Sequence, residues 1–471
     1  MLRKIFVYCL YIASSGATAA IAQSAKNMTT ISLDNLDAFQ NPGKNWNLAA
    51  DAVADYTKDQ DIKPIAGKGA VVNIVGKSDN TPLTTNESFG DVQIELDFMM
   101  TRNSNSGVYL QGRYEVQLFD SWTKLNPTFS DCGGIYQRWD DARGSNNEGY
   151  EGIAPLMNVS KAPGLWQHLL IKFRAPKFND KGEKIANARF DEVYLNGKLI
   201  QLQSSVTGPT RSSIFNDEKP TGPLVLQGDH GNVAFRNIQY GPIDETPVEM
   251  SEDNPITVKA NGKPYLLRSF LNYGDKKLTH VISAGYPNQL NYSYDLKQGA
   301  IFQIWRGEFL DVTDMWHERG EPQLAKPLGS VITLSDAPAL AVLATANAAW
   351  TDSIGFDDFH NEGYTLDENR FASFAYTVNN MHVTDKIAAK NATSLNRQLD
   401  ITNAPANLYC RIASAGKIEL IGKDLFAIDG KSYYLNVAES FKPQIRQTQN
   451  GQELIVALPA NTASLTYSIT W

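Results

Sequence analysis

The fold class of this chain is decided by one stretch, DVQIELDFMM at residues 91–100, in which polar and apolar side chains alternate. Successive side chains of a β-strand point to opposite faces, so this alternation predicts a strand with one buried face. A turn-forming cluster, RNSNSG, follows at residues 102–107, and a second alternating run extends from Val108 to Phe119. We expect these two runs to be neighbouring antiparallel strands.

Further strand-like runs fill the N-terminal half, at residues 166–174, 189–195, 199–202, 224–228 and 233–240. Asn196-Gly197 stands between two of these runs and is typical of a two-residue hairpin turn. Helical periodicity is scarce. Many short strands separated by turns predict an all-β fold, a sandwich or jelly roll.

The composition changes at residues 241–262, which are acidic, contain prolines and lack apolar periodicity, so we expect a linker there. Strand-like runs resume behind it, at residues 265–270, 300–305, 330–334, 371–378, 408–413, 417–420, 454–458 and 464–471. The sequence therefore predicts a second β-rich, sandwich-like domain. The expected boundaries are a signal peptide at 1–22, a jelly-roll domain at 23–243, a linker at 244–262 and a C-terminal domain at 263–471.

The N-terminus has the features of a secretory signal peptide. Arg3 and Lys4 precede an apolar stretch, and Ala20-Ile21-Ala22 forms a small-x-small cleavage site before Gln23. A membrane anchor is the alternative, but its serine and alanine content makes it weakly hydrophobic for a span. We expect a periplasmic or secreted protein with no transmembrane segment after cleavage.

Charge and cysteine content narrow the function classes. The formal net charge is −8, so the chain has no excess of positive charge to attract phosphate groups, and nucleic acid is not an expected partner.

Cys132 and Cys410 lie far apart in the sequence. Two separate buried thiols are favoured over an interdomain disulfide.

The common catalytic motifs are absent: the sequence has no G-x-S-x-G, H-E-x-x-H, P-loop or C-x-x-C motif. The histidines are scattered singly, so neither a metal site nor a cofactor is expected. The loop Asn103–Gly107 has residue types that can hold calcium, but a solvated turn is the favoured explanation.

The polar face of the run Val108–Phe119 is a candidate carbohydrate site. If the run is one strand, it places an aromatic ring, two amides, a guanidinium and a carboxylate in one row: Tyr109, Gln111, Arg113, Glu115 and Gln117. Residues two apart in a strand are about 6.6 Å apart, which is the size of a sugar ring. A solvated sheet face is the alternative. A second cluster, at residues 226–238, contributes Gln227, His230 and Arg236. A third, at residues 131–139, contributes Tyr136, whose ring can stack on a sugar or belong to the core.

The N-terminal half resembles the 3-keto-disaccharide hydrolase domain family. The matching stretches follow the family order across residues ~30–243: Asn105–Tyr109, Tyr114–Gln117 with Asp120, Gly134–Tyr136, Tyr194–Gly197, Leu226-Gln227 with His230, and Phe235–Ile238. The resemblance implies a concanavalin-like jelly-roll sandwich in an exported protein that acts on oxidised glycosides. The long loop Arg138–Ala162 departs from the family pattern and would change substrate choice.

The resemblance implies an enzyme that cleaves 3-keto-disaccharides or 3-keto-glucosides by C2 deprotonation and elimination or hydrolysis at C1. Such chemistry needs a base, an acid and a donor to the ketone oxygen. Our candidate catalytic residues are Glu115 as base, His230 as acid, Asp120 to orient His230 or an arginine, and Arg236 as enolate stabiliser. Our candidate substrate-binding residues are Tyr109, Gln111, Arg113, Gln117, Tyr136 and Gln227. The alternatives are a non-catalytic carbohydrate-binding protein of the cell envelope and an envelope scaffold without a small ligand.

In the C-terminal half, Trp305–Asp311 and Trp316–Gly320 are rich in tryptophan and arginine. They resemble a β-rich module of exported bacterial proteins. Packing at the domain interface is favoured for them over a second binding site.

Overall fold

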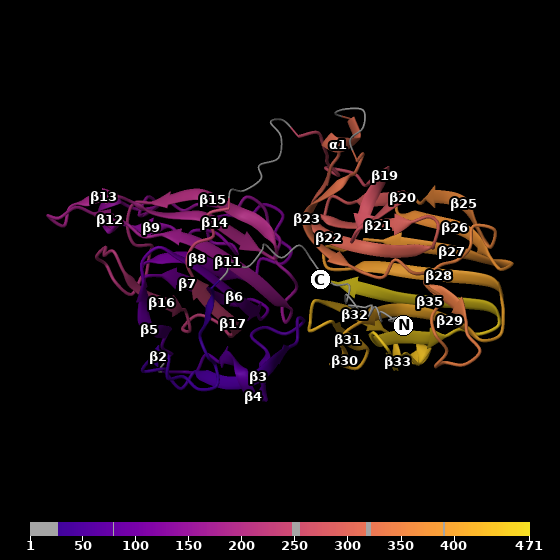
Figure 1. Ribbon diagram of the computed structural model, residues 1–471, viewed down its shortest axis with the longest axis horizontal. Helices are drawn as coiled ribbons and strands as arrows, with labels where there is room; N and C mark the ends of the chain where they lie inside the picture. The colour runs from indigo at the N-terminus through magenta and orange to yellow at the C-terminus, as the bar shows by residue number, and fades with distance from the viewer. Residues whose placement is uncertain (1–26, 79, 247–254, 317–321, 390) are drawn as a thin grey trace, which may run out of the picture.

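A computed structural model of the chain describes residues 27–78, 80–246, 255–316, 322–389 and 391–471. Antiparallel sheets dominate it, as the alternating sequence predicts, and the helical elements are short: α1 (Thr313–Trp316), η1 (Asp141–Arg143) and η2 (Glu439–Phe441). Among the described strands, none up to β17 pairs with any from β18 onward. Figure 1 shows the two resulting domains side by side. The expected signal peptide lies outside the described residues.

The N-terminal domain is built on two antiparallel sheets. The eight-stranded sheet has the order β15 (Lys198–Val206), β14 (Ala188–Leu195), β11 (Trp166–Arg174), β6 (Val92–Met100), β17 (Val233–Gly241), β4 (Ile62–Asn73) and β3 (Trp46–Ala54), with β1 (Thr29–Thr30) on β17. The five-stranded sheet has the order β2 (Phe39–Gln40), β5 (Leu83–Phe89), β16 (Gly222–Leu226), β7 (Asn105–Leu110) and β8 (Tyr114–Phe119). Two small ribbons complete the domain: β9 (Arg138–Trp139) with β10 (Gly149–Tyr150), and β12 (Lys177–Phe178) with β13 (Lys184–Ala186).

These two sheets form a sandwich because each has one apolar face. Leu96, Phe98 and Phe235 of the eight-stranded sheet share one hydrophobic core with Val108 and Val116 of the five-stranded sheet. The intervening polar residues therefore point away from the core on both sides. The all-β, jelly-roll class expected from the alternation is confirmed.

Two details of the expected topology are wrong. Strands β6 and β7 are not neighbours, since β6 lies in the eight-stranded sheet and β7 in the five-stranded one. The run Val108–Phe119 is not one strand either, because it turns back at Gln111 and Gly112, whose φ angles are 57° and 64°. The hairpin at Asn196-Gly197, between β14 and β15, is confirmed.

The C-terminal domain contains three antiparallel sheets. The six-stranded sheet has the order β18 (Thr257–Val258), β22 (Ala300–Asp311), β21 (Leu290–Asp295), β20 (Lys276–Gly285) and β19 (Tyr265–Tyr273), with β23 (Lys326–Thr333) on β22. The four-stranded sheet has the order β24 (Leu340–Val342), β29 (Leu408–Ala415), β34 (Gly451–Ala457) and β33 (Gln444–Thr448). The eight-stranded sheet has the order β25 (Phe359–Leu366), β26 (Ala372–Val378), β27 (Met381–Ala388), β28 (Leu395–Ala404), β35 (Asn461–Thr470), β32 (Tyr433–Val437), β31 (Leu425–Ile428) and β30 (Ile418–Leu420). Strand β18 lies inside the segment expected to be a linker.

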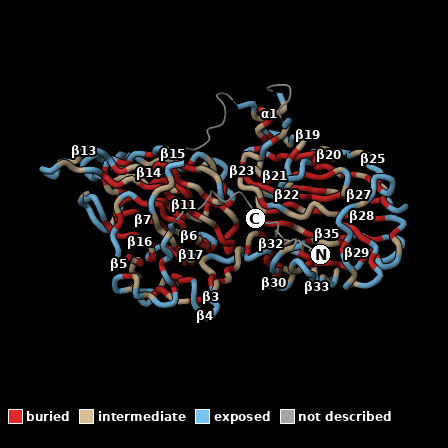
Figure 2. The backbone as a smooth tube through the Cα atoms, in the orientation of Figure 1, coloured by how far each residue is buried: buried red, intermediate tan, exposed pale blue. Residues whose placement is uncertain are grey.

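The domains are joined by direct packing as well as by the connecting chain. Trp122 and Leu165 of the N-terminal domain belong to the main hydrophobic core of the C-terminal domain. The Trp122 indole N–H donates to the carbonyl oxygen of Trp471 at 2.6 Å, and the Lys431 ammonium pairs with Asp51. Figure 2 shows buried segments reaching the boundary between the domains.

The cysteines confirm the favoured prediction. Cys132 and Cys410 are both free and buried, one in each domain. Burial raises the pKa of the Cys132 thiol to about 11, so this side chain stays protonated and inert at neutral pH.

Candidate functional site

The polar row predicted for one strand is instead folded into a hairpin. Gln111, Gly112 and Arg113 form its loop, and Tyr109 on β7 lies directly opposite Glu115 on β8. Both side chains occupy the outer face of the five-stranded sheet, because Val108 and neighbouring residues of like parity fill the core. Directly opposed side chains on antiparallel strands are close enough to interact, so the hairpin turns two members of the row into a pair.

Glu115 is the most perturbed acid of this face. It is 2% exposed, and the Tyr109 hydroxyl donates a hydrogen bond to it. Burial, reinforced by the negative charge of Asp229, raises the pKa of the Glu115 carboxyl to about 8, although the bond from Tyr109 opposes the shift. A carboxyl group with a pKa near neutrality can exchange a proton with a substrate at physiological pH.

Gly107 makes room for this carboxyl group. A Cβ atom at position 107 would lie 2.2 Å from Glu115 Oε1, a distance that side chains do not tolerate. Gln117, the partner of Gly107 across the hairpin, is buried and donates from Nε2 to Asn105 Oδ1 at 3.0 Å. The absence of a side chain at Gly107 therefore sets the position of the acid.

Two other segments bring polar groups to the same face. The Tyr136 amide donates to the carbonyl oxygen of Glu115 at 3.1 Å, which places Tyr136 beside the outer edge of β8. On the other side, the Gln227 amide donates to the Gly107 carbonyl oxygen at 2.9 Å. The Gln227 side-chain oxygen is buried and has no hydrogen-bond partner among the described residues. An unpartnered buried acceptor is available to a ligand hydroxyl.

His230 follows Gln227 and is oriented by Asp229. Its Nδ1–H donates to Asp229 Oδ1 at 2.7 Å, and in this tautomer Gln227 Nε2, which is a donor 3.2 Å from the same nitrogen, does not bond to it. With Nδ1–H donating to Asp229, Nε2 is left free to act toward a ligand, in the orientation that a carboxylate partner gives a catalytic imidazole. The predicted residues gathered on this face are Tyr109, Glu115, Gln117, Tyr136, Gln227 and His230, and we call them the Glu115 cluster.

Gln111 and Arg113 belong to the architecture of the hairpin. Gln111 Nε2 donates to the carbonyl oxygens of Phe89 and Pro220, each at 3.0 Å. The Arg113 guanidinium pairs with Asp217 at 2.6 Å. Gln111 Nε2 and the Arg113 guanidinium are therefore engaged in bonds that fasten the loop before β16, while Gln111 Oε1 is buried and has no hydrogen-bond partner among the described residues.

Asp120 and Arg236 do not join the Glu115 cluster. Asp120 accepts from the Asn103 amide at 2.9 Å and lines a cavity of about 400 Å³ at the domain boundary, so Asp229 and not Asp120 orients His230. Arg236 lies on the outer face of the other sheet, where Nε is 3.2 Å from Asp97 Oδ2. The sandwich core separates the two outer faces, so Arg236 cannot stabilise an enolate at Glu115.

Three residues that shape the cluster are not among the candidates that the sequence predicts: Asn105, Gly107 and Asp229. Asn105 and Gly107 lie in the predicted turn cluster, whereas in the structure they belong to β7. Asp229 precedes a selected histidine, and its adjacency was the available signal. Strand register was needed to show which neighbour each of them has.

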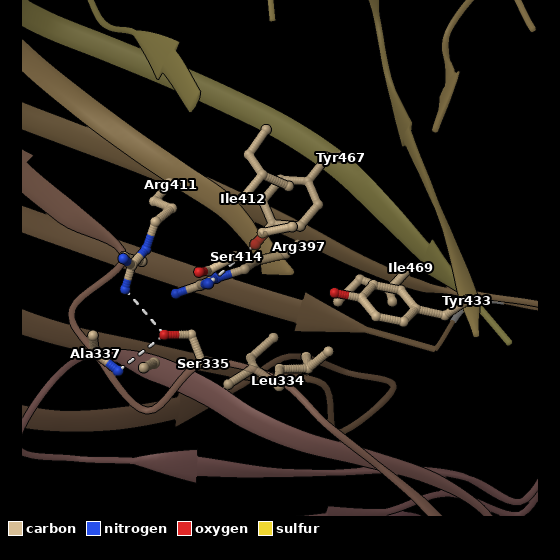
Figure 3. A pocket seen from close by; sticks show the side chains of 14 residues that line it. Leu334, Ser335, Ala337, Arg397, Arg411, Ile412, Ser414, Tyr433, Tyr467 and Ile469 are labelled. Carbon is tan, nitrogen blue, oxygen red and sulfur yellow. Dashed lines mark hydrogen bonds between the residues drawn. The ribbon is translucent and has the colours of Figure 1, made fainter. Parts of the chain in front are cut away.

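The tryptophan- and arginine-rich stretch of the C-terminal domain serves packing where it is described. Trp305 is fully buried, and its indole N–H donates to the Glu308 carbonyl oxygen at 3.0 Å. Figure 3 shows a cavity of this domain that is lined by Arg397 and Arg411. Its volume is about 30 Å³, which is room for a water molecule and not for a sugar.

No group of three or more His, Cys, Asp or Glu side chains among the described residues is arranged to hold a metal ion. No helix in the same part of the chain combines the length and apolarity needed to cross a membrane.

Comparison with known proteins matches the N-terminal half to one family model. Residues 33–240 match the family model described as a 3-keto-alpha-glucoside-1,2-lyase-like domain, which supports a function on glycosides. No curated protein matches the chain. Two crystal structures from Parabacteroides distasonis ATCC 8503, each described as a "putative glycosyl hydrolase", are similar to it at 22% and 19% identity. Each similarity covers 46% of this chain, with 92% and 100% of the respective relative, at a TM-score of 0.31.

Proposed function

We propose that this chain, whose residues 33–240 form a 3-keto-alpha-glucoside-1,2-lyase-like domain, cleaves glycosides that carry a ketone at C3 of the sugar. The observation that carries the proposal is Glu115, an acid 2% exposed with a pKa of about 8, on a sheet face with other polar groups. A ketone acidifies the neighbouring C–H bond, and a base with a pKa near the working pH is suited to removing that proton.

The reaction proceeds by elimination. The Glu115 carboxylate takes the C2 proton, and the electron pair of the C–H bond forms an enolate between C2 and C3. The enolate re-forms the C3 ketone as a C1–C2 double bond appears and the C1–O bond breaks. The leaving oxygen receives a proton, so the products are an alcohol and an unsaturated 3-keto sugar. Addition of water across the new double bond then gives 3-keto-glucose, which is net hydrolysis.

The residues of the Glu115 cluster divide these tasks. Tyr109 orients Glu115 through its hydrogen bond and favours the ionised form that acts as base. His230, in its doubly protonated form with Nδ1–H donating to Asp229, gives its Nε2 proton to the leaving oxygen and becomes neutral. The hydroxyl groups of the sugar meet the unpartnered oxygen of Gln227 and the side chains of Gln117 and Tyr136. The pathway uses no paired nucleophile and acid, unlike ordinary glycoside hydrolysis.

The proposal includes an exported location and a carbohydrate partner. The first 22 residues have the pattern of a cleaved signal peptide, so we place the protein in the periplasm or outside the cell. Its partner is a small carbohydrate. Neither a nucleic acid nor a cofactor takes part in the proposal.

The proposal is tested by incubating the purified chain with 3-keto-trehalose and with a 3-keto-β-glucoside, each beside its unoxidised parent. We expect release of the alcohol only from the oxidised sugars, and loss of release in Glu115→Gln. In D₂O, elimination and re-addition of water place deuterium at C2 of the product, whereas direct hydrolysis does not. Binding of either sugar without any release would instead assign the second candidate, a non-catalytic carbohydrate-binding protein.

A further inference from the structure

The two domains enclose a cavity of about 590 Å³ on the opposite side of the sandwich from Glu115. Its N-terminal wall is the outer face of the eight-stranded sheet, where β6, β11 and β17 contribute side chains. Its C-terminal wall is β23 with the loop at residues 429–432, and Figure 1 shows β11 and β23 at the facing sides of the two domains. The volume falls within the range of small-molecule sites.

The walls of this cavity are held in place by bonds between the domains. The Trp166 amide donates to the Lys431 carbonyl oxygen at 3.2 Å, and Ser330 Oγ donates to the Asn196 carbonyl oxygen at 2.9 Å. The Trp166 ring carries the Arg236 guanidinium on its face, 4.1 Å from the ring centroid. The cavity is therefore pre-formed and not a gap between loosely associated parts.

In this cavity the Asp97 carboxylate accepts hydrogen bonds from two basic side chains. Asp97 accepts from Arg236 Nε at 3.2 Å and from His168 Nδ1 at 2.9 Å. The Nη1 and Nη2 atoms of Arg236 have no hydrogen-bond partner within the described part of the chain. A planar guanidinium with two free amino groups is suited to bidentate contact with a carboxylate or phosphate.

Within the described part of the chain, two lysines of the cavity form no ion pair. Lys161 Nζ donates to the Trp166 carbonyl oxygen at 3.3 Å, and Lys198 Nζ to the Pro327 carbonyl oxygen at 3.5 Å, and neither pairs with a carboxylate among the described residues. Burial lowers the pKa of Lys161 to about 8; the negative charge of Asp97 opposes this shift and repulsion from Arg236 adds to it. The cations Lys161, Lys198 and Arg236 outnumber the carboxylates Asp97 and Asp429 in the cavity lining. A desolvated excess of positive charge is unfavourable and favours the binding of a further anion.

We propose that the interdomain cavity binds a small polyhydroxylated anion, a sugar acid or a sugar phosphate, with its anionic group between Lys161 and Arg236. Lys198 adds positive charge from β15, and Gln167 and Thr333 are polar residues of the remaining lining that can meet hydroxyl groups. The site lies across the sandwich from the Glu115 cluster, so both can be occupied at once. The ligand contacts both domains and would stabilise their association.

The test is isothermal titration calorimetry of the full chain with glucuronate, glucose 6-phosphate, inorganic phosphate and glucose. We expect one equivalent of at least one sugar anion to bind at least tenfold more tightly than inorganic phosphate, and glucose not to bind at this site. Glucuronate and glucose 6-phosphate identify the carboxylate or phosphate source. Equal binding of glucose, or of inorganic phosphate alone, overturns the proposal.

Variants locate the binding. Lys161→Met and Arg236→Met should weaken it at least tenfold, Lys161→Arg should retain it, and the matched surface variant Lys181→Met should not change it. Glu115→Gln should bind the anion as the natural chain does, which separates this site from the proposed active site. Full affinity in both Lys161→Met and Arg236→Met would overturn the assignment. Should either fail to fold, as judged by circular dichroism, Lys198→Met provides the same comparison from β15 of the same wall.

Discussion

Tyr109 and Glu115 face each other across the β7–β8 hairpin, and the phenol hydroxyl donates a hydrogen bond to a carboxyl group that is almost entirely shielded from water. Each affects the titration of the other: the bond lowers the pKa of Glu115, while the carboxylate and burial raise that of Tyr109. Burial still dominates at Glu115 and leaves its pKa near 8. The pair therefore keeps a proton at neutral pH that an exposed glutamate would have lost.

This raised pKa predicts how stability depends on pH. Between pH 4.5 and about 8 the folded state holds a proton on Glu115 that the unfolded state releases, so stability falls as pH rises through that range. The slope from this one group is about 1.4 kcal/mol per pH unit. Glu115→Gln removes it, so the variant should match the natural chain at pH 5 and exceed it in stability at pH 9. Urea unfolding at both pH values measures this, and equal pH dependence of the two proteins would contradict it.

The same group predicts the pH profile of the reaction. Below its pKa only a fraction of Glu115 is ionised, so kcat/KM should rise about tenfold per pH unit and level off near pH 8. Tyr109→Phe deletes the bond that lowers the pKa, so its inflection should move to higher pH. Initial rates on a 3-keto-glycoside between pH 5 and 10 give both curves. A flat profile in the natural chain would exclude Glu115 as the base.

Gly107 offers a test of the geometry without touching a polar group. Gly107→Ala would place a Cβ 2.2 Å from Glu115 Oε1 and displace the carboxyl group, since the backbone of β7 is fixed by pairing on both sides. We expect kcat/KM to fall by about 10²-fold or more, as misplacement of about 1 Å does elsewhere. Gly76→Ala, whose Cβ would meet only ordinary contacts of 3.5 Å or more, is the control. Full activity of Gly107→Ala would show that the carboxyl group does not need this position.

The sequence predicts the strands of this fold well, because one buried face imposes alternation on each of them. It does not reveal the turn at Gln111–Arg113. Leu110 and Tyr114 are paired and both point into the core, so the three-residue loop keeps the alternation in phase and hides the reversal. Gly112 within the run was the signal for a break.

What the sequence cannot predict about the site also results from relying on local alternation. The sequence predicts site residues as polar side chains on a strand or beside a glycine, and the structure brings four of them together: Glu115, Tyr109, Gln117 and His230. Alternation predicts that the Arg236 side chain points away from the core, but it does not predict on which of the two outer faces of the sandwich that side chain lies. That distinction depends on which strands pair, and pairing partners far apart in the sequence leave no local periodicity.

The ion pair between Lys431 and Asp51 predicts how the two domains unfold. The Lys431 side chain is 1% exposed, and Asp51 also accepts from the Trp166 indole N–H at 3.0 Å. Lys431→Met would leave the half-buried Asp51 carboxylate without its cation, at a cost of about 2–3 kcal/mol. Differential scanning calorimetry should show a lower Tm or a split transition, whereas the exposed control Lys423→Met should not differ from the natural chain.

The loss of stability in Lys431→Met should depend on pH, because the Asp51 carboxyl group titrates. The hydrogen bonds and the charge of Lys431 outweigh burial and hold the pKa of Asp51 below its ordinary value of 3.8. The pair therefore stabilises the folded state fully above that value, and its contribution is lost as pH falls through the folded pKa. The difference between Lys431→Met and the natural chain should shrink as the pH drops below 3.8. A difference that stays constant from pH 7 to pH 3 would mean that Lys431 acts through packing and not through its charge.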